Sequence, residues 1–257
     1  MLDIDVQRFL QVIKTKGVMS EEDVVREVVS IFGDNCTMSL IEMINKRLEP
    51  FNMTIKSAIC ELTGRKYWVF TANVIDKVMK YPGQFTEVQL EFIRKVFSEI
   101  INSDDGYVST MNCINVRSQM IGKFSPTQAE RMLNVMAEQM WVYHQNGKVY
   151  IGVRSIGELM QYFKDCYADG LNVCSMCKDT LFHGHKCEEC DAANHLYCLA
   201  KAFKYQKNLK CLRCETPVNA QNLPEVEEDY SMDVEVDDDV PVKPRNTHKP
   251  RKSQKRS

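Results

Sequence analysis

Four pairs of side chains in the C-terminal part of the sequence share one spacing. In each pair, a Cys or His is followed after two other residues by a Cys. The pairs are Cys174 and Cys177, Cys187 and Cys190, His195 and Cys198, and Cys211 and Cys214. A two-residue gap lets a tight turn point two donor atoms at one tetrahedral ion, and cysteine with histidine is the usual donor set of zinc. One such pair is common by chance, but four between residues 174 and 214 predict a zinc module.

Eight donors fill two tetrahedral sites and leave no position open for a catalytic water. Both predicted zinc ions are therefore structural, which disfavours a metallohydrolase. A segment this short buries too little surface to fold alone, so metal must supply the folding energy, on the order of 10–16 kcal/mol per site. The alternative is free cysteines packed as small apolar residues. His183 and His185 are surplus donors, and either could replace Cys187 in a shifted register.

Two assignments of the pairs to the ions are open. In a sequential one, the first two pairs share an ion, and the nine residues between Cys177 and Cys187 permit this. In an interleaved one, as in RING domains, the first and third pairs share an ion. Apolar and lysine residues after Cys198 are spaced as in a short helix, which matches the central RING helix and favours interleaving. The predicted sets are Cys174, Cys177, His195 and Cys198 for one zinc ion, and Cys187, Cys190, Cys211 and Cys214 for the other.

The remaining composition indicates a soluble intracellular protein. There are 11 cysteines in 257 residues, and those outside the module are scattered singly, which argues against a disulfide framework. The first residues resemble no signal peptide, and no apolar run is long enough to span a membrane. The formal net charge of −2 gives no strong field toward nucleic acid.

Residues 1 to about 75 show three helical patterns followed by a hairpin pattern. Apolar residues recur at helical spacing from Val6 to Ile13, a second helix starts at the Ser20 cap, and a third follows Ser39. Apolar, β-branched and aromatic residues from Ile55 to Phe70 flank a turn and predict a β-hairpin.

The same order then repeats. Capping-box sequences predict helices that start at Thr86 and Ser125, with a short helix over about 109–120 between them. Asn146-Gly147 predicts a tight hairpin turn, and a last helix is expected over about 155–167. Three helices and a hairpin are typical of a winged helix. The alternative is one irregular helical domain with two unrelated hairpins.

The predicted fold class is mainly α with small β-hairpins: tandem winged-helix domains followed by a RING-like zinc module. The predicted domains are winged helices at 1–82 and 83–168, the zinc module at 169–219, and a tail at 220–257. Nine acidic residues and then seven basic ones predict that the tail is disordered. The basic cluster from Lys249 to Arg256 is either a nuclear-import signal or a solvated tail.

The ligand order of four Cys, one His and three Cys after tandem winged helices resembles the non-SMC element 1 subunit of the SMC-five/six chromosome maintenance complex. The resemblance covers residues 1 to about 216. It is most specific in Cys174-Ser-Met-Cys177, in Cys187-Glu-Glu-Cys190-Asp-Ala-Ala-Asn-His195-Leu-Tyr-Cys198, and in Cys211-Leu-Arg-Cys214. It implies a nuclear, chromosome-associated subunit that binds a MAGE-type winged-helix partner and serves DNA repair by homologous recombination. It also implies ubiquitin-ligase activity through a variant RING, with DNA contacted weakly or through the complex.

Some side chains fit docking of a ubiquitin-conjugating enzyme better than others. Met176 is apolar, as RING surfaces usually are there, and Leu212 replaces the usual proline after the seventh ligand. Glu215 stands where a basic residue often follows the eighth ligand, so strong activity of the isolated protein is not expected.

Two competing functions remain. A non-catalytic scaffold or chromatin reader could use the same ligand order, but a histone-binding PHD finger usually carries a tryptophan where this chain has Leu209. A winged-helix DNA binder would need several cations for phosphate contact. The predicted third helices offer only Lys46 and Arg47 in the first domain and Arg131 in the second.

Overall fold

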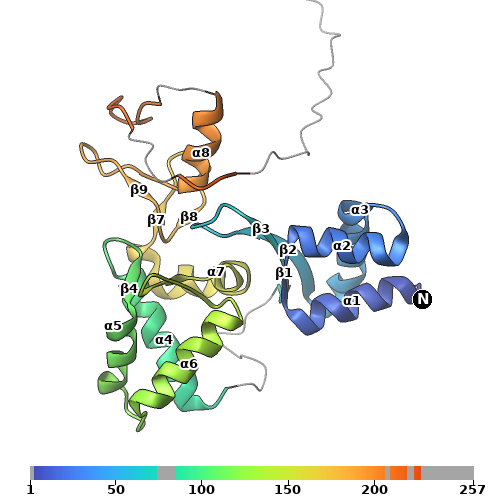
Figure 1. The fold of residues 1–257 in the computed structure, drawn as a ribbon, viewed down its shortest axis with the longest axis horizontal. Helices are drawn as coiled ribbons and strands as arrows, with labels where there is room; N and C mark the ends of the chain where they lie inside the picture. Colours follow the sequence, from blue (N-terminus) through green and yellow to red (C-terminus); the bar gives the residue numbers. More distant parts are fainter. Residues whose placement is uncertain (1–2, 74–84, 206–208, 219–222, 227–257) are drawn as a thin grey trace, which may run out of the picture. The chain divides into compact units, whose positions relative to one another are not determined.

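The computed structural model describes residues 3–73, 85–205, 209–218 and 223–226 (Figure 1). The predicted boundary at 82/83, and the tail beyond residue 226 with its basic cluster, lie outside the described residues. Within the described ranges, no helix is long and apolar enough to cross a bilayer.

The first half contains three helices and a three-stranded antiparallel sheet of order β1-β3-β2. Its elements are α1 (Ile4–Lys16), β1 (Val18–Ser20), α2 (Glu21–Phe32), α3 (Thr37–Leu48), the 3₁₀ helix η1 (Glu49–Phe51), β2 (Met53–Ile59) and β3 (Lys66–Ala72). The Ser20 hydroxyl caps α2 by accepting from the backbone N–H of Asp23. Fully buried Phe9, Ile13 and Ile44 lie in the core that the helices form with the sheet.

The second half repeats this order, with a sheet of order β4-β6-β5. Its elements are α4 (Glu87–Ile101), β4 (Tyr107–Ser109), α5 (Thr110–Asn115), the 3₁₀ helix η2 (Val116–Gln119), α6 (Pro126–Glu138), β5 (Val142–Gln145), β6 (Lys148–Ile151), α7 (Val153–Tyr167) and the 3₁₀ helix η3 (Ala168–Gly170). Both predicted capping boxes form, at Thr86 and at Ser125. Asn146 and Gly147 have φ of 52° and 71°, as a two-residue hairpin turn requires.

The strands β1 and β4 were not expected from the sequence. Each has only three residues and leads directly into a helix cap, so no alternating pattern can develop. The first strand of each half pairs with the last strand. The predicted mainly helical fold with small antiparallel sheets is confirmed, while the assignment of each half to the winged-helix class stays a prediction.

Helix α7 packs on the sheet of the first half as well as on its own. Val153 is buried in a cluster with Val18 and Val69 of the first sheet. A Cβ built on Gly157 would lie 2.6 Å from Cγ2 of Val69, so only glycine allows this close approach. The two halves therefore share a packed interface through one helix.

The C-terminal module consists of two small hairpins and one helix. Its elements are β7 (Asn172–Val173), β8 (Thr180–Leu181), β9 (His185–Lys186), β10 (Ala193–Asn194) and α8 (Leu196–Tyr205). Strand β7 pairs with β8, and β9 with β10. The helix predicted between the third and fourth pairs is present, although it begins before Cys198 rather than after it.

Four residues from the start of the predicted tail are described by the structure and pack against the zinc module. Residues 223–226 lie against α8, where Val226 is 8% exposed and packs with Tyr197 and Ala200. The ammonium group of Lys204 donates a hydrogen bond to the carbonyl of Val226. The apolar side chains of Leu223 and Val226 make this contact. The sequence pattern did not predict it, because the residues that follow are mostly acidic.

Candidate metal centre

Three of the four donor pairs sit in the same tight turn. In each, the N–H of the residue after the second Cys donates to the carbonyl of the first Cys, at 3.0 Å in all three turns. That following residue has a left-handed backbone: φ is 66° at Lys178, 57° at Asp191 and 60° at Glu215. This turn geometry points the two sulfurs of a pair in the same direction, so that both can bind one metal ion. The His195–Cys198 pair instead lies at the start of α8.

The first cluster joins the first and third pairs. Nδ1 of His195 lies 3.3 Å from Sγ of Cys177 and 3.8 Å from Sγ of Cys198. The backbone N–H of His195 donates to Sγ of Cys174 at 3.5 Å. All four donor atoms lie within 4.8 Å of one another, and Cys174 and His195 are buried.

The second cluster joins the second and fourth pairs. The sulfurs of Cys187 and Cys214 are 3.5 Å apart, and those of Cys190 and Cys211 are 3.6 Å apart. These four sulfurs also lie within 4.8 Å of one another.

Both donor sets fit a tetrahedral zinc ion. Zn–S bonds of about 2.3 Å place sulfurs at the corners of a tetrahedron about 3.8 Å apart. The observed spacings of 3.3–3.8 Å match that edge. The two clusters are consistent with two zinc ions in a RING-like domain, and the grouping is the interleaved one. His183 and His185 belong to neither of these two groups.

Each cluster contains at least one thiol whose pKa is lowered, so that it ionises readily. Burial opposes ionisation of Cys174, but the backbone N–H groups of Cys177, His195 and Met176 donate to its sulfur and lower its pKa to about 7. The hydroxyl and backbone N–H of Thr216 lower the pKa of Cys214 to about 6. Because zinc binds the thiolate, these sulfurs favour capture of the ion near neutral pH.

The ring of His195 is held by neighbours inside the module and by one residue outside it. Its Nε2 lies 3.2 Å from the carbonyl oxygen of Thr180 and 3.3 Å from Oε1 of Glu61, which belongs to the β2–β3 turn of the first half. Tyr197 stacks on the ring, with centroids 4.6 Å apart. Sequence reasoning missed Glu61, since a single carboxylate in a hairpin turn carries no motif.

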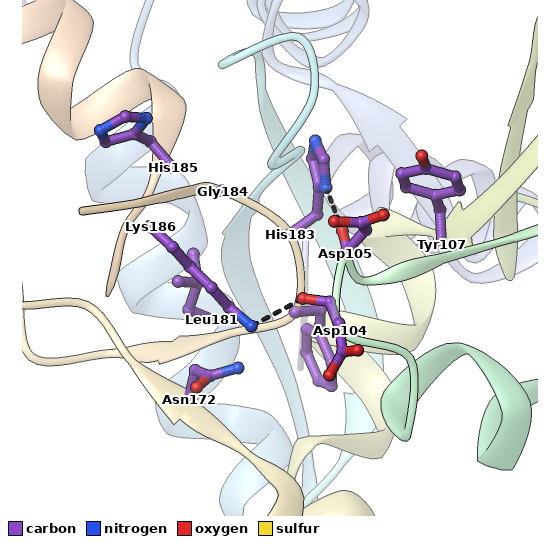
Figure 2. A pocket seen from close by; sticks show the side chains of 10 residues that line it. Asp104, Asp105, Tyr107, Asn172, Leu181, His183, Gly184, His185 and Lys186 are labelled. Atoms are coloured by element: carbon purple, nitrogen blue, oxygen red, sulfur yellow. Dashed lines mark hydrogen bonds between the residues drawn. The ribbon is translucent and has the colours of Figure 1, made fainter. Parts of the chain in front are cut away.

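The β8–β9 loop is held by the second half as well. Phe182 is buried in the core of that half, with its ring edge-on to Phe163 at 5.3 Å between centroids. Nδ1 of His183 lies 2.7 Å from the carbonyl oxygen of Asp105, and Lys186 donates to the carbonyl of Asp104, as Figure 2 shows. These loops line a pocket of about 310 Å³.

The predicted docking side chains both lie on the Cys-x-x-Cys turns. Leu212, on the turn of the fourth pair, is 67% exposed. Met176, on the turn of the first pair, is half-buried. The structure places these two side chains on the module surface, while their role in docking stays a prediction.

The family model described as "Nse1 non-SMC component of SMC5-6 complex" matches residues 7–159. The chain belongs to this family. The model of a RING-like domain matches residues 174–214, which contain both clusters. The resemblance seen in the sequence is thereby confirmed.

Curated relatives and a solved structure agree with this assignment. The chain is 32% identical over 216 residues to the non-structural maintenance of chromosomes element 1 homolog of Bos taurus, with 81% of each chain covered. It is 28% identical over 207 residues to the element 1 protein of Schizosaccharomyces pombe, covering 79% of this chain and 86% of that one. A chain of the solved Nse1-Nse3-Nse4 complex superposes with a TM-score of 0.76 at 25% identity, covering 84% of this chain and 97% of that chain.

Proposed function

We propose that this protein is a RING-type ubiquitin-ligase subunit of the SMC5-6 chromosome maintenance complex. The observation that carries the proposal is a RING-like module with two complete four-donor clusters and an exposed leucine on one zinc turn. Closed clusters have no position for a substrate, so any activity must come from docking at the surface. A ligase of this kind holds a ubiquitin-charged conjugating enzyme in a reactive geometry and does no covalent chemistry itself.

The two turns supply apolar contacts for such an enzyme. Met176 and Leu212 offer side chains that can be buried on docking, and each turn is fixed by its metal and its backbone hydrogen bond. Glu215, after the eighth ligand, provides no positive charge to hold ubiquitin. The lone protein is therefore proposed to be a weak ligase that improves when a partner orders the module.

The proposed partners are a MAGE-type winged-helix subunit and the other subunits of the SMC5-6 complex. The solved relative was determined in a complex titled Nse1-Nse3-Nse4, which supports this part of the proposal. The proposed biological role is DNA repair by homologous recombination, in the nucleus and on chromosomes. The few cations on α3 and α6 favour the use of these helices for protein contacts over direct DNA binding.

The test is a ubiquitin-discharge assay over a panel of conjugating enzymes, with and without the winged-helix partner. We expect slow discharge by the lone protein and discharge at least about tenfold faster with the partner. Ordering a few interface side chains, at roughly 0.5–1.5 kcal/mol each, accounts for that factor. Met176→Ala and Leu212→Ala should slow discharge with two zinc ions retained, and Val173→Ala, on a residue that is also exposed, serves as the control.

Two results would count against the proposal. If the complex discharges no enzyme of the panel, the alternative holds, namely a zinc-stabilised scaffold or chromatin reader in the same complex. If the lone protein is fully active and the partner adds nothing, the interpretation of Leu212 and Glu215 fails. Imaging a chain that ends at Asp239 tests nuclear import separately, because that chain lacks the basic cluster.

A further inference from the structure

The turn between β2 and β3 of the first half reaches the first zinc cluster. The turn is closed by backbone hydrogen bonds from Cys60 to Arg65 and from Gly64 to Cys60. A Cβ built on Gly64 would lie 3.3 Å from Cβ of Tyr197, the residue that stacks on His195. A segment more than 100 positions earlier in the sequence therefore lies directly against the residue that stacks on a ligand of the first zinc cluster.

The carboxylate of Glu61, at this turn, is 6% exposed and meets three donors of the module. Oε1 accepts from the backbone N–H of Phe182 at 3.0 Å, and Oε2 accepts from that of His183 at 2.7 Å. Oε1 also lies 3.3 Å from Nε2 of His195. A buried carboxylate is costly unless it is fully hydrogen-bonded, so this set of contacts is specific rather than incidental.

The two ring nitrogens of His195 have separate environments. Nδ1 faces the sulfurs of the cluster, and Nε2 faces Glu61 and the carbonyl of Thr180. When zinc is bound at Nδ1, the proton of a neutral imidazole is on Nε2, where it can be shared between these two oxygens. A carboxylate on the outer nitrogen fixes the tautomer and orientation of a zinc-binding histidine.

We propose that Glu61 is a positioning residue for the first zinc cluster and couples that cluster to the N-terminal half of the chain. Glu61 holds the Nε2 proton of His195 and at the same time fixes the β8–β9 loop through two backbone N–H groups. Zinc retention at one cluster thus depends on a side chain outside the RING-like sequence. The inference rests on zinc at this cluster and is independent of ligase activity.

The experiment measures zinc release from the full-length chain to a chromogenic chelator. In Glu61→Gln, we expect one of the two zinc ions to leave about 10–100-fold faster, because losing an outer-shell partner usually lowers metal affinity by that factor. The other ion, in the four-sulfur cluster, should leave at the wild-type rate. The matched control is Glu21→Gln, which removes a carboxylate 2.7 Å from Lys66 on the same half but outside the module contact. Both ions should be unaffected there.

A second readout separates positioning from simple docking. The ¹⁵N resonances of the His195 ring should show the Nε2–H tautomer in the wild type and a shifted, more rapidly exchanging Nε2 proton in Glu61→Gln. If Glu61 only docks the module, Glu61→Gln will lower stability while release rates and ring resonances stay at wild-type values, and the proposal is overturned.

If Glu61→Gln fails to fold, a second variant, Glu61→Asp, still tests the proposal. Glu61→Asp keeps the charge but shortens the side chain by one methylene, and it should show faster release of the same single ion. Wild-type release rates in Glu61→Asp together with unchanged ring resonances would overturn the proposal. A negative ubiquitin-discharge assay does not bear on either readout, so the two proposals can fail separately.

Discussion

Replacing Phe182 by alanine should raise the population of chains in which the zinc module is undocked from the second half, while both zinc ions stay bound. The side chain is 7% exposed and edge-on to Phe163 at 5.3 Å. A buried aromatic side chain hides roughly 150–250 Å², or about 4–6 kcal/mol at 25 cal/mol per Å² as an upper estimate. Measured Phe→Ala losses in cores are about 3–5 kcal/mol. Phe182 belongs to the zinc module but is buried in the core of the second half. We therefore expect most of the lost free energy to weaken docking of the module on that half.

Hydrogen exchange measures that equilibrium. A loss of about 3–5 kcal/mol raises the population of the opened module by roughly a hundred- to several-thousand-fold. The amide of His183, which donates to Glu61, should lose protection by this factor while the zinc count remains two per chain. In Phe182→Leu, which keeps a large apolar side chain, the same amide should lose far less protection.

The matched control is Phe51→Ala, since Phe51 is 74% exposed on η1 and its loss should change stability by less than about 0.5 kcal/mol. If Phe182→Ala reduces amide protection in the β8–β9 loop no more than Phe51→Ala does, Phe182 is not the anchor. Loss of zinc in Phe182→Ala would show that the module cannot hold its metal once undocked.

Three further predictions follow from the same contacts. His195→Ala should bind about one zinc ion per chain by atomic absorption, whereas His183→Ala should keep two, and loss of metal in the latter would contradict the ligand assignment. Exposed Cys166 should react rapidly with a maleimide. Cys113 should react only on unfolding, because burial raises the pKa of its thiol to about 12. Rapid labelling of both thiols in the native chain would contradict this contrast. Val226→Ala should lower the free energy of unfolding by about 1–2 kcal/mol in urea titration, and no measurable loss would show that the packing of Val226 on α8 does not contribute to stability.

Local signals in the sequence predicted most of the helices, the β2–β3 and β5–β6 hairpins and the donor sets, but not the short strands β1 and β4. The capping boxes at Thr86 and Ser125 and the Asn146-Gly147 turn act within a few residues, and each forms as expected. The donor pairs are equally local, because a two-residue gap determines the turn that brings them together. Their interleaving required only the helical spacing after Cys198.

Contacts between distant segments left no such signal. The packing of Gly157 on Val69 joins two halves that each look self-contained in the sequence. Glu61 and Phe182 are ordinary hairpin and loop residues until the module is placed beside them. The role of such residues depends on tertiary geometry, and a reading of periodicity and spacing cannot supply it.

The hydrogen bonds from Phe182 and His183 to Glu61 span 121 and 122 positions of the chain. During synthesis, the N-terminal half can fold long before its partner residues leave the ribosome. Until then the carboxylate of Glu61 stays hydrated at an open hairpin tip, because the two backbone N–H groups from which it accepts hydrogen bonds are not yet beside it. We therefore expect docking of the metal-loaded module to be the last folding step, and we expect a shortage of zinc to leave chains with a folded N-terminal half and an uncovered hairpin tip.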